Sequence, residues 1–350
     1  MEWSSYPIGD YPGELWSDWQ DLAVRHHAAN PMLDAEFVKC LVMHFGDVVR
    51  LRVLVGKYDN SVAILALVES IGLGRWWVFR PSQAQTALLV GSPTIRVDWN
   101  RVLTALPGVC LKLDVLSLDP REHPLLLGYS PLTQREDSAR NICVDVDRTF
   151  SEYWEDRPRK LKQNIRRYRN RISEEFGQLK FVVASTPSDV AAATDRYGIL
   201  ESRGWKGKVG TALHPGNLQG KFYRSLMVTM AEHSRAFVFE LYVDDILLAT
   251  RLCLAGDAIL VMLKTTYDES FRRYATGRLL LHDTLQYVFE NDLAKVVDFY
   301  TNATDDQMDW ATSFRSMSHA SIYRSVTMRL IIRGLRSAKD LVKRVLPGHT

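Results

Sequence analysis

Residues 235–302 carry the clearest pattern of hydrophobic and polar positions in the chain. RAFVFELYVDD is rich in β-branched and aromatic residues and predicts a strand, Asp244-Asp245 predicts a turn, and ILLATRLCLAGD predicts the second strand of a hairpin. A third strand is predicted over 258–266, and VVDFYTN predicts a short strand at the end of the segment. Between them, apolar residues recur at helical spacing along one face, at Leu279, Leu280, Thr284, Leu285, Val288 and Phe289. The predicted order is hairpin, strand, loop, helix and strand.

The polar loop before that helix is basic and contains a glycine. Arg272, Arg273 and Arg278 flank Gly277, which would let a ligand come close to the backbone. A helix start offers unpaired N–H groups and the positive end of the helix dipole, and both suit phosphate oxygens. The preceding strand would deliver the other end of a long ligand along its edge. The pattern predicts a site for a pyrophosphate with a long arm, such as coenzyme A.

The first half of the chain predicts similar elements without a basic glycine loop. Two helices are predicted over 14–46, followed by a hairpin that turns at Asp59-Asn60. Strands are predicted in IGLGRWWVFRPS, VCLKLDVLSL and NICVDVD, the last after a long irregular connection, EHPLLLGYSPLTQREDSAR. His26 and His27 are adjacent on a helix and point about 100° apart, so they do not predict a metal site. We expect this half to bind no cofactor.

A basic helix is predicted between the two halves. Leu161, Ile165, Tyr168 and Ile172 mark its buried stripe. The window 157–171 contains no acidic residue and eight basic ones: Arg157, Arg159, Lys160, Lys162, Arg166, Arg167, Arg169 and Arg171. One interpretation is a contact surface for an anionic acceptor, such as a nucleotide-sugar, a polysaccharide precursor, a lipid phosphate or RNA. The other is a solvated face of a connecting helix, and the two carry equal weight.

Composition limits these interpretations. A length of 350 residues predicts two domains or one large double module. The net charge of +3 excludes a polycation, so anion binding must come from local patches. The four scattered cysteines predict reduced, mostly buried thiols of a cytosolic protein. Neither a signal peptide nor a long apolar run is found, so we expect a cytoplasmic protein without a membrane span.

The second half of the chain resembles the GNAT acyltransferase superfamily. Arg272-Arg-Tyr-Ala275-Thr-Gly277 is similar to its pyrophosphate loop, Arg/Gln-x-x-Gly-x-Gly/Ala, with Ala275 at the first glycine position. More closely, 151–323 resembles the two-module branch of cellulose-biosynthesis-associated acetyltransferases and peptidoglycan-bridge aminoacyltransferases, and the first half resembles it loosely. The resemblance implies acetyl-CoA or another acyl-CoA as co-substrate and no metal. The cofactor-binding residues that it implies are Leu263, Lys264, Arg272, Arg273, Ala275, Thr276, Gly277, Arg278 and Asn302.

The resemblance also implies an α+β fold of mixed α/β character, with tandem GNAT-like modules. Each module is expected to be a mostly antiparallel mixed sheet flanked by helices. The expected ranges are 1–150 for a degenerate first module, 151–178 for the basic helix, 179–325 for the acyltransferase module and 326–350 for a basic amphipathic helix. For the last segment, peripheral membrane contact is one interpretation. A docked helix or a partner contact is favoured, because Gly334 weakens the helix and no aromatic anchor is present.

Three residues are candidates for proton transfer: Glu201, Asp298 and Tyr300. Asp298 and Tyr300 are expected two apart on one strand and therefore on one face. The competing interpretation is structural, with Glu201 as a cap or as the partner of Arg203, and with Tyr300 in the core. Backbone N–H groups near Leu263 are expected to polarise a thioester carbonyl. Orientation of two substrates can itself supply much of a rate enhancement, so a dedicated base is not required.

The acceptor side of the expected site rests on Ser202-Arg-Gly-Trp205-Lys206-Gly207, which resembles a loop of the same branch. Trp205 is expected to stack on a sugar or acyl chain, and Lys206 to contact an anionic substrate. The alternatives are a packed aromatic residue and a surface lysine. Arg166 is a further substrate-binding candidate. The Tyr or Tyr-Lys that relatives carry after the position of Asn302 is absent, since Gln307-Met308 and Trp310 stand there.

The leading prediction is an acyl-CoA-dependent acyltransferase, with N-acyl transfer favoured over O-acyl transfer. Its acceptor is expected to be a small molecule or glycan precursor of envelope or exopolysaccharide metabolism, and this class follows from the resemblance alone. Aminoacyl transfer from charged tRNA is the second hypothesis, supported by the basic helix, although nucleic acid is the less favoured partner. A non-catalytic scaffold of a polysaccharide-synthesis complex is the third, supported by the absent Tyr and Lys. Membrane association through 326–350 stays open.

Overall fold

The structure is a computed structural model that describes residues 1–123 and 131–332. The chain divides into two compact units. The first unit contains residues 1–26, 46–138 and the segment from Ser316 onward, and the second contains 27–45 and 139–315. These units differ from the predicted ranges, because an early helix belongs to the second unit and the last strand belongs to the first.

The first unit is built on one sheet. Its elements are β1 (Glu2–Pro7), η1 (Ile8–Asp10), α1 (Leu15–His27), β2 (Leu51–Tyr58), β3 (Ser61–Gly72), β4 (Arg75–Val78), β5 (Leu89–Gly91), α3 (Trp99–Ala105), β6 (Lys112–Leu118) and β13 (Ser313–Tyr323), which enters the unit at Ser316. The strand order is β1-β2-β3-β4-β6-β13, with β5 paired to β3. Asp59 and Asn60 both adopt positive φ, as a two-residue turn requires, so the predicted hairpin β2–β3 is confirmed. Trp76, Val102, Leu113 and Ile322 lie in its core.

The second unit holds a longer set of elements around a mixed sheet. They are η2 (Pro31–Leu33), α2 (Ala35–Phe45), β7 (Thr133–Asp145, from Ala139 on), α4 (Phe150–Glu155), α5 (Arg159–Phe176), β8 (Leu179–Ala184), α6 (Pro187–Arg203), α7 (Trp205–Lys208), α8 (Leu218–Glu232), β9 (Ala236–Val243), β10 (Ile246–Ala255), β11 (Ile259–Tyr267), η3 (Glu269–Tyr274), α9 (Thr276–Glu290), β12 (Val296–Asp298) and α10 (Asp305–Met308). The strand order is β7-β12-β11-β10-β9-β8. Only the β11–β12 pair is parallel within this order.

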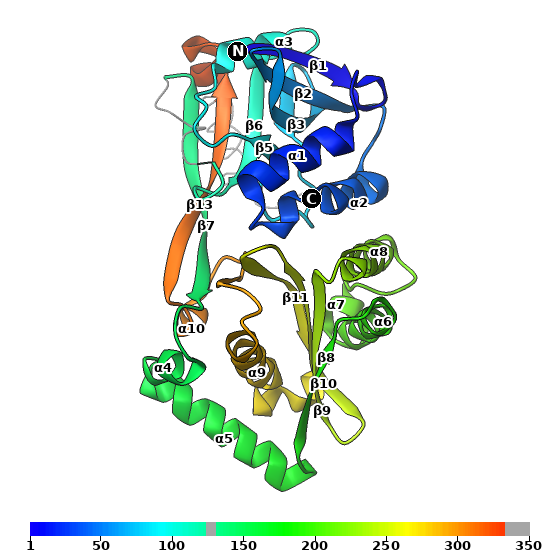
Figure 1. The fold of residues 1–350 in the computed structure, drawn as a ribbon, viewed down its shortest axis with the longest axis vertical. Helices are drawn as coiled ribbons and strands as arrows, with labels where there is room; N and C mark the ends of the chain where they lie inside the picture. Colours follow the sequence, from blue (N-terminus) through cyan, green and yellow to red (C-terminus); the bar gives the residue numbers. More distant parts are fainter. Residues whose placement is uncertain (124–130, 333–350) are drawn as a thin grey trace, which may run out of the picture. The chain divides into compact units, whose positions relative to one another are not determined.

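Helices cover both faces of the part of the sheet that belongs to the second unit (Figure 1). Helix α9 packs on β9, β10 and β11, and α4 and α5 pack against α9. The core on this side includes Phe239, Leu280 and Leu285, together with Leu161 and Ile165 from the buried stripe of α5. On the opposite face lie α6 and α8, and α2 packs on α8. The apolar stripes predicted for α5 and α9 therefore face the core, as their helical spacing requires.

The predicted order of elements over 235–302 is confirmed, with two corrections elsewhere. Strand β7 begins at Thr133, eight residues before the strand predicted in NICVDVD. The half-exposed TQREDSAR segment lacks an apolar face, so its sequence does not show the strand. Strand β1 was not predicted, and it pairs along the whole of its length with β2.

The predicted C-terminal helix is described only at its start. Residues 326–332 are helical, and the rest of the predicted segment 326–350 lies outside the described residues. Within the described part of the chain, no helix combines the length and the apolar composition needed to cross a bilayer. The mixed α+β fold predicted from the sequence is confirmed by the sheet and its covering helices.

Candidate functional site

The sheet of the second unit opens between β11 and β12. The two strands pair in parallel only at Ile259–Val261, opposite Val296–Asp298, and β11 continues to Tyr267 after β12 has ended. A bulge lies at the same level: Leu252 of β10 faces Lys264, and Cys253 faces Met262, so Leu263 is the extra residue of β11. The bulge bends β11 close to the point where its pairing with β12 ends. This edge leads directly to η3 and to the start of α9.

The start of α9 keeps its first N–H groups uncapped by side chains. Ala275 precedes the helix in the left-handed conformation, with φ 49° and ψ 45°, and no side chain of the described residues caps the helix. The backbone N–H groups of Arg278 and Leu279 both bond to the Ala275 carbonyl, while Thr276 and Gly277 form the first turn. A Cβ placed on Gly277 would meet only Tyr267, at an ordinary contact distance of 3.6 Å. This helix end has the properties of an anion site.

The three arginines of the loop have different partners. Arg273 forms an ion pair of 2.5 Å with Glu175 of α5, and Arg278 forms one of 2.5 Å with Asp306 of α10. Arg272 is exposed and has no ion pair with any residue that the structure describes. The Tyr274 hydroxyl donates to Glu175 and is the main cause of the lowered pKa of that carboxyl. Arg272 is therefore the loop cation that is left for a ligand, and the other two tie the loop to α5 and α10.

Ala275 allows a direct test of backbone strain in this loop. Ala275→Gly is expected to raise the free energy of unfolding by about 1 kcal/mol, because a left-handed conformation costs a non-glycine residue about 1–2 kcal/mol. Urea unfolding measures the change. Ala192→Gly, at an exposed position inside α6, is the control, and it should lower stability by about 1 kcal/mol. Equal losses in both variants would show that the loop is not strained at Ala275.

Glu201 holds the loop between α6 and α8 together. Its carboxylate is buried and accepts from the Tyr197 hydroxyl at 3.1 Å, from Lys206 Nζ at 2.5 Å and from the Leu213 backbone N–H at 2.8 Å. Its partner is therefore Lys206, not Arg203 as the structural interpretation supposed. Lys206 is paired with this carboxylate, and its contact with an anionic substrate stays a prediction.

Lys264 extends from β11 toward the same group of side chains. It lies opposite Leu252, and its Nζ lies 5.7 Å from the centroid of the Tyr223 ring of α8. Burial lowers the pKa of Lys264, Lys206 lowers it further, and Glu201 acts in the opposite direction. Burial, with Glu201 as a second cause, raises the pKa of both Tyr197 and Tyr223. These two phenols therefore stay protonated at neutral pH.

Asp298 is at the centre of a second buried group. Its carboxylate accepts from Asn141 Nδ2 at 2.7 Å, from the Tyr300 backbone N–H at 3.1 Å and from Arg315 Nη2 at 2.8 Å. The expectation that Asp298 and Tyr300 share a strand face is wrong, because β12 ends at Asp298 and Tyr300 adopts a φ of 39°. The turn follows from the side chain of Asp298 bonding to the backbone two residues on.

Tyr300 and Asn302 make contacts within the protein. The Tyr300 hydroxyl accepts from Asn30 Nδ2 at 2.8 Å, and the Arg315 guanidinium lies 5.1 Å from its ring centroid. Asn302 uses its side-chain oxygen to accept from the Arg140 backbone N–H at 3.1 Å. The roles proposed for Asp298 and Tyr300 in proton transfer, and for Asn302 in binding, stay predictions.

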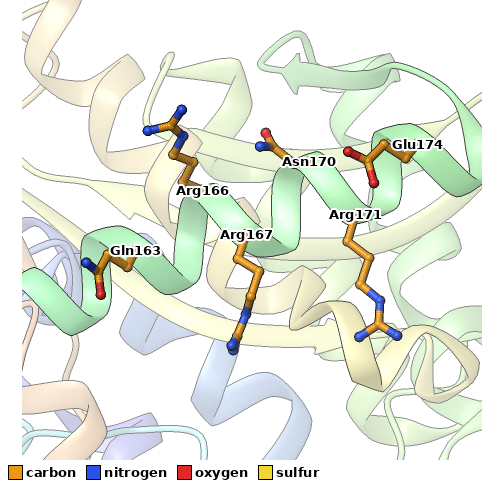
Figure 2. A pocket seen from close by; sticks show the side chains of 6 residues that line it. All are labelled: Gln163, Arg166, Arg167, Asn170, Arg171 and Glu174. Atoms are coloured by element: carbon orange, nitrogen blue, oxygen red, sulfur yellow. The ribbon is translucent and has the colours of Figure 1, made fainter.

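Trp205 and Arg166 are on different parts of the surface. The Trp205 side chain is 60% exposed, and its backbone N–H donates to Glu269 at 2.9 Å, which joins α7 to η3. Arg166 lies on the outer face of α5 (Figure 2), beside a pocket lined only by that helix, by Gln163, Arg166, Arg167, Asn170, Arg171 and Glu174. One helix supplies every lining side chain, so the pocket has no opposing wall. Trp205 therefore neighbours the loop before α9, whereas Arg166 belongs to the basic helix.

Arg251 was missed by the sequence analysis. It lies on β10 opposite Thr265, is 5% exposed and contacts the sulfur of Met262. Its Nε has no hydrogen-bond partner among the described residues, and burial lowers the pKa of Arg251 to about 10. A strand arginine between apolar neighbours gives no sign of depth in a sequence, because arginine is usually exposed. Tyr197 and Tyr223 were missed for a related reason, since both fit the apolar faces of their helices.

Among the described residues, the cysteines and the possible metal ligands do not add a reactive group to this site. Cys40, Cys110, Cys143 and Cys253 are all buried and none of the four forms a disulfide, so the prediction of reduced, buried thiols is confirmed in its structural part. Burial raises the pKa of the Cys253 thiol to about 12 and that of Cys40 to about 11, which removes their nucleophilic character at neutral pH. Over residues 1–123 and 131–332, no group of three or more His, Cys, Asp or Glu side chains is arranged to hold a metal ion.

The comparison with family models identifies the region that contains this site. Residues 159–308 match the model of an acetyltransferase (GNAT) domain. The chain contains a GNAT domain. The match runs from the start of α5 to the end of α10, so it includes the opening beside β11, the uncapped end of α9 and the Glu201 group. The resemblance to the GNAT superfamily is thereby confirmed, and the link to cellulose biosynthesis stays a prediction.

Solved structures extend the likeness beyond the GNAT domain. FemX matches with a TM-score of 0.58 and 10% identity, over 95% of this chain and 100% of FemX. L-PGS from Bacillus licheniformis matches with a TM-score of 0.53 and 12% identity, over 91% of this chain and 95% of that one. A tandem GNAT protein from the clavulanic acid biosynthesis pathway matches with a TM-score of 0.51 and 15% identity, over 93% and 99%. At these identities the likeness is one of fold, and it confirms the tandem GNAT-like architecture.

A comparison with curated protein sequences found no match.

Proposed function

We propose that this protein transfers an acyl group from acyl-CoA to an amine of a small-molecule or glycan-precursor acceptor. One observation carries the proposal: the free outer edge of β11 leads from the bulge at Leu263 to the uncapped N-terminus of α9. A pantetheine arm is an extended chain with amide groups, which suits a strand edge. A pyrophosphate suits a helix start with an exposed arginine, here Arg272. The residues present therefore fit a coenzyme A thioester as donor.

The roles of individual residues follow from their positions. Backbone N–H groups at the start of α9 and the Arg272 guanidinium would bind phosphate oxygens. Backbone N–H groups of β11 around Leu263 would polarise the thioester carbonyl, because no strand of the described residues pairs with that side of β11 past Val261. Lys264 and the Glu201 group lie on the sheet face covered by α6 and α8, which is the proposed acceptor side. Envelope or exopolysaccharide metabolism is proposed from the sequence resemblance.

Donor binding tests the proposal. Titration of acetyl-CoA into the full chain, followed by calorimetry, is expected to give a measurable Kd. Arg272→Ala should weaken binding by about tenfold to a hundredfold, since a hydrogen bond to a charged group contributes about 1.5–3 kcal/mol. Arg224→Ala, on α8, is the matched control and should leave the Kd unchanged, because Arg224 pairs with Asp195 on α6. Absence of binding by any member of an acyl-CoA panel, with a folded protein, would overturn the proposal.

Aminoacyl transfer from charged tRNA is the second candidate, and the outer face of α5 favours it. Arg159, Lys160 and Arg166 are exposed and form no ion pair within the described part of the chain. In contrast, Arg169 pairs with Asp283, and Arg171 pairs with Glu175 at 3.2 Å. Binding of tRNA that falls steeply with salt, without acyl-CoA binding, would favour this candidate. A chain that binds neither ligand would favour the scaffold hypothesis.

A further inference from the structure

We propose that Lys264 is the proton acceptor for the attacking amine in the acyl transfer. The inference rests on the proposed acyl-CoA-dependent function and adds the residue that moves the proton. Lys264 comes immediately after the bulge residue Leu263, at the point where β11 loses its outer neighbour. Its side chain is on the face opposite to α9, so it approaches the thioester position from the proposed acceptor side.

The amine of Lys264 is held without a partner. It forms no hydrogen bond or ion pair with any residue of the described ranges, and its contact with Tyr223 is through the aromatic ring. A partly buried ammonium without a counter-ion is unfavourable, which favours the neutral amine that a base requires. The lowered pKa of Lys264 agrees with this environment.

Other titratable groups around Lys264 are already engaged. On α6, Glu201 accepts three hydrogen bonds and Tyr197 donates to it. On α7, Lys206 is paired with Glu201. Its positive charge therefore lies near Lys264, and it largely neutralises the negative charge of the Glu201 carboxylate. On α8, the pKa of Tyr223 is raised, so its phenol stays neutral. Asp298, the other carboxylate near the opening, is paired with Arg315. Lys264 is therefore the group of this set that can accept a proton.

The proposed step converts an amine and a thioester into an amide and a thiol. The acceptor nitrogen attacks the thioester carbonyl carbon, the N–C bond forms, and the C–S bond breaks with its electron pair on sulfur. The proton lost by the acceptor nitrogen passes to Lys264 Nζ and from there to the leaving thiolate. The products are an amide and free coenzyme A thiol, and Lys264 returns to its neutral form.

A labelling experiment tests the state and the place of Lys264 without any acceptor. The intact protein is treated briefly with acetic anhydride over a series of pH values, and modification of each lysine is measured by mass spectrometry. The expected midpoint for Lys264 is lower in the folded protein than in the same chain unfolded in urea. Saturating acetyl-CoA, with its binding measured separately by calorimetry, should protect Lys264 and leave the exposed Lys221 of α8 unprotected.

The outcomes separate this inference from the proposed function. An unchanged or higher midpoint in the folded protein, or acetyl-CoA binding without protection of Lys264, would overturn the role of Lys264 and leave donor binding intact. Failure of acetyl-CoA to bind would overturn the proposed function itself. With an amine that the protein acetylates, Lys264→Met and Lys264→Arg should both lower kcat about a hundredfold at unchanged KM for acetyl-CoA. Both variants should also lose the rising limb of the pH profile. Normal turnover by Lys264→Arg would contradict the role, since a guanidinium stays protonated.

Discussion

Asp298→Asn is expected to lower the free energy of unfolding by about 3–5 kcal/mol, the usual cost of removing one partner of a buried ion pair. Asp298 is fully buried, and the side chain of Arg315, 2.8 Å away, is 13% exposed. The amide would remove the negative charge that now faces the guanidinium at 2.8 Å, and it would present an NH2 group to donors that now face oxygen. Chemical denaturation followed by circular dichroism measures the loss. It would occur whether or not Asp298 also takes part in proton transfer.

A second substitution separates charge from packing at this position. Asp298→Asn combined with Arg315→Met removes both charges, and it should recover part of the stability that the single variant loses. A double variant as unstable as the single one would show that hydrogen bonds to Asn141 and to the Tyr300 backbone dominate. A single variant of normal stability with no acyltransferase activity would instead show that Asp298 acts in the chemistry. That result would support the interpretation made from the sequence.

Arg251→Met is expected to stabilise the protein, by about 1–4 kcal/mol, because replacing buried charges with apolar residues of similar volume often does so. The Arg251 guanidinium is buried: its Nε lacks a partner within the described residues, and its Nη1 contacts the thioether sulfur of Met262. Methionine keeps the aliphatic part of the side chain and removes the charge. Thermal unfolding at neutral pH, where Arg251 is protonated, measures the gain.

Two comparisons make the Arg251 result interpretable. Arg224→Met, at an exposed position of α8 paired with Asp195, should change stability by less than about 0.5 kcal/mol. Arg251→Lys keeps the charge, so it should give no gain. A destabilised Arg251→Met would mean that the guanidinium is solvated or bound by a group outside this chain. If the Arg251→Met variant were more stable but no longer bound the donor, the protein would keep Arg251 for function at a cost in stability.

The hairpins and helix α9 could be predicted because their signals are local. Asp59-Asn60 and Asp244-Asp245 favour tight turns whatever surrounds them, and the apolar spacing of α9 is complete within fifteen residues. The first residues of strand β7 carry no such local signal. Its first residues are polar and half-exposed, and they form a strand only because neighbouring strands from distant parts of the chain pair with them. Register of that kind is decided by tertiary contacts.

The loop and the start of α9 could be predicted from the sequence, but the pairing of the charged side chains in the candidate site could not. Arg273 and Arg278 look free in the sequence, yet their partners Glu175 and Asp306 are supplied by other elements. In the same way, Glu201 pairs with Lys206, five residues on, whereas Asp298 pairs with Arg315 from the following strand. Neither pairing has a spacing rule that a sequence would reveal. Lys264 was predicted to lie in the site, but its burial depends on α6 and α8 and could not be predicted from the residues next to it.

The division of the chain has a consequence for its synthesis. Strand β13 pairs with β6 in the first unit, although some two hundred residues separate them along the chain. The ribosome synthesises the amino-terminal segments long before β13. Until β13 has been made, the edge of β6 that pairs with it stays unpaired in the nascent first unit. If the two halves of the sequence were expressed separately, the first unit would lack β13 and the second unit would lack residues 27–45. Heterologous production of this protein should therefore start from the uncut polypeptide.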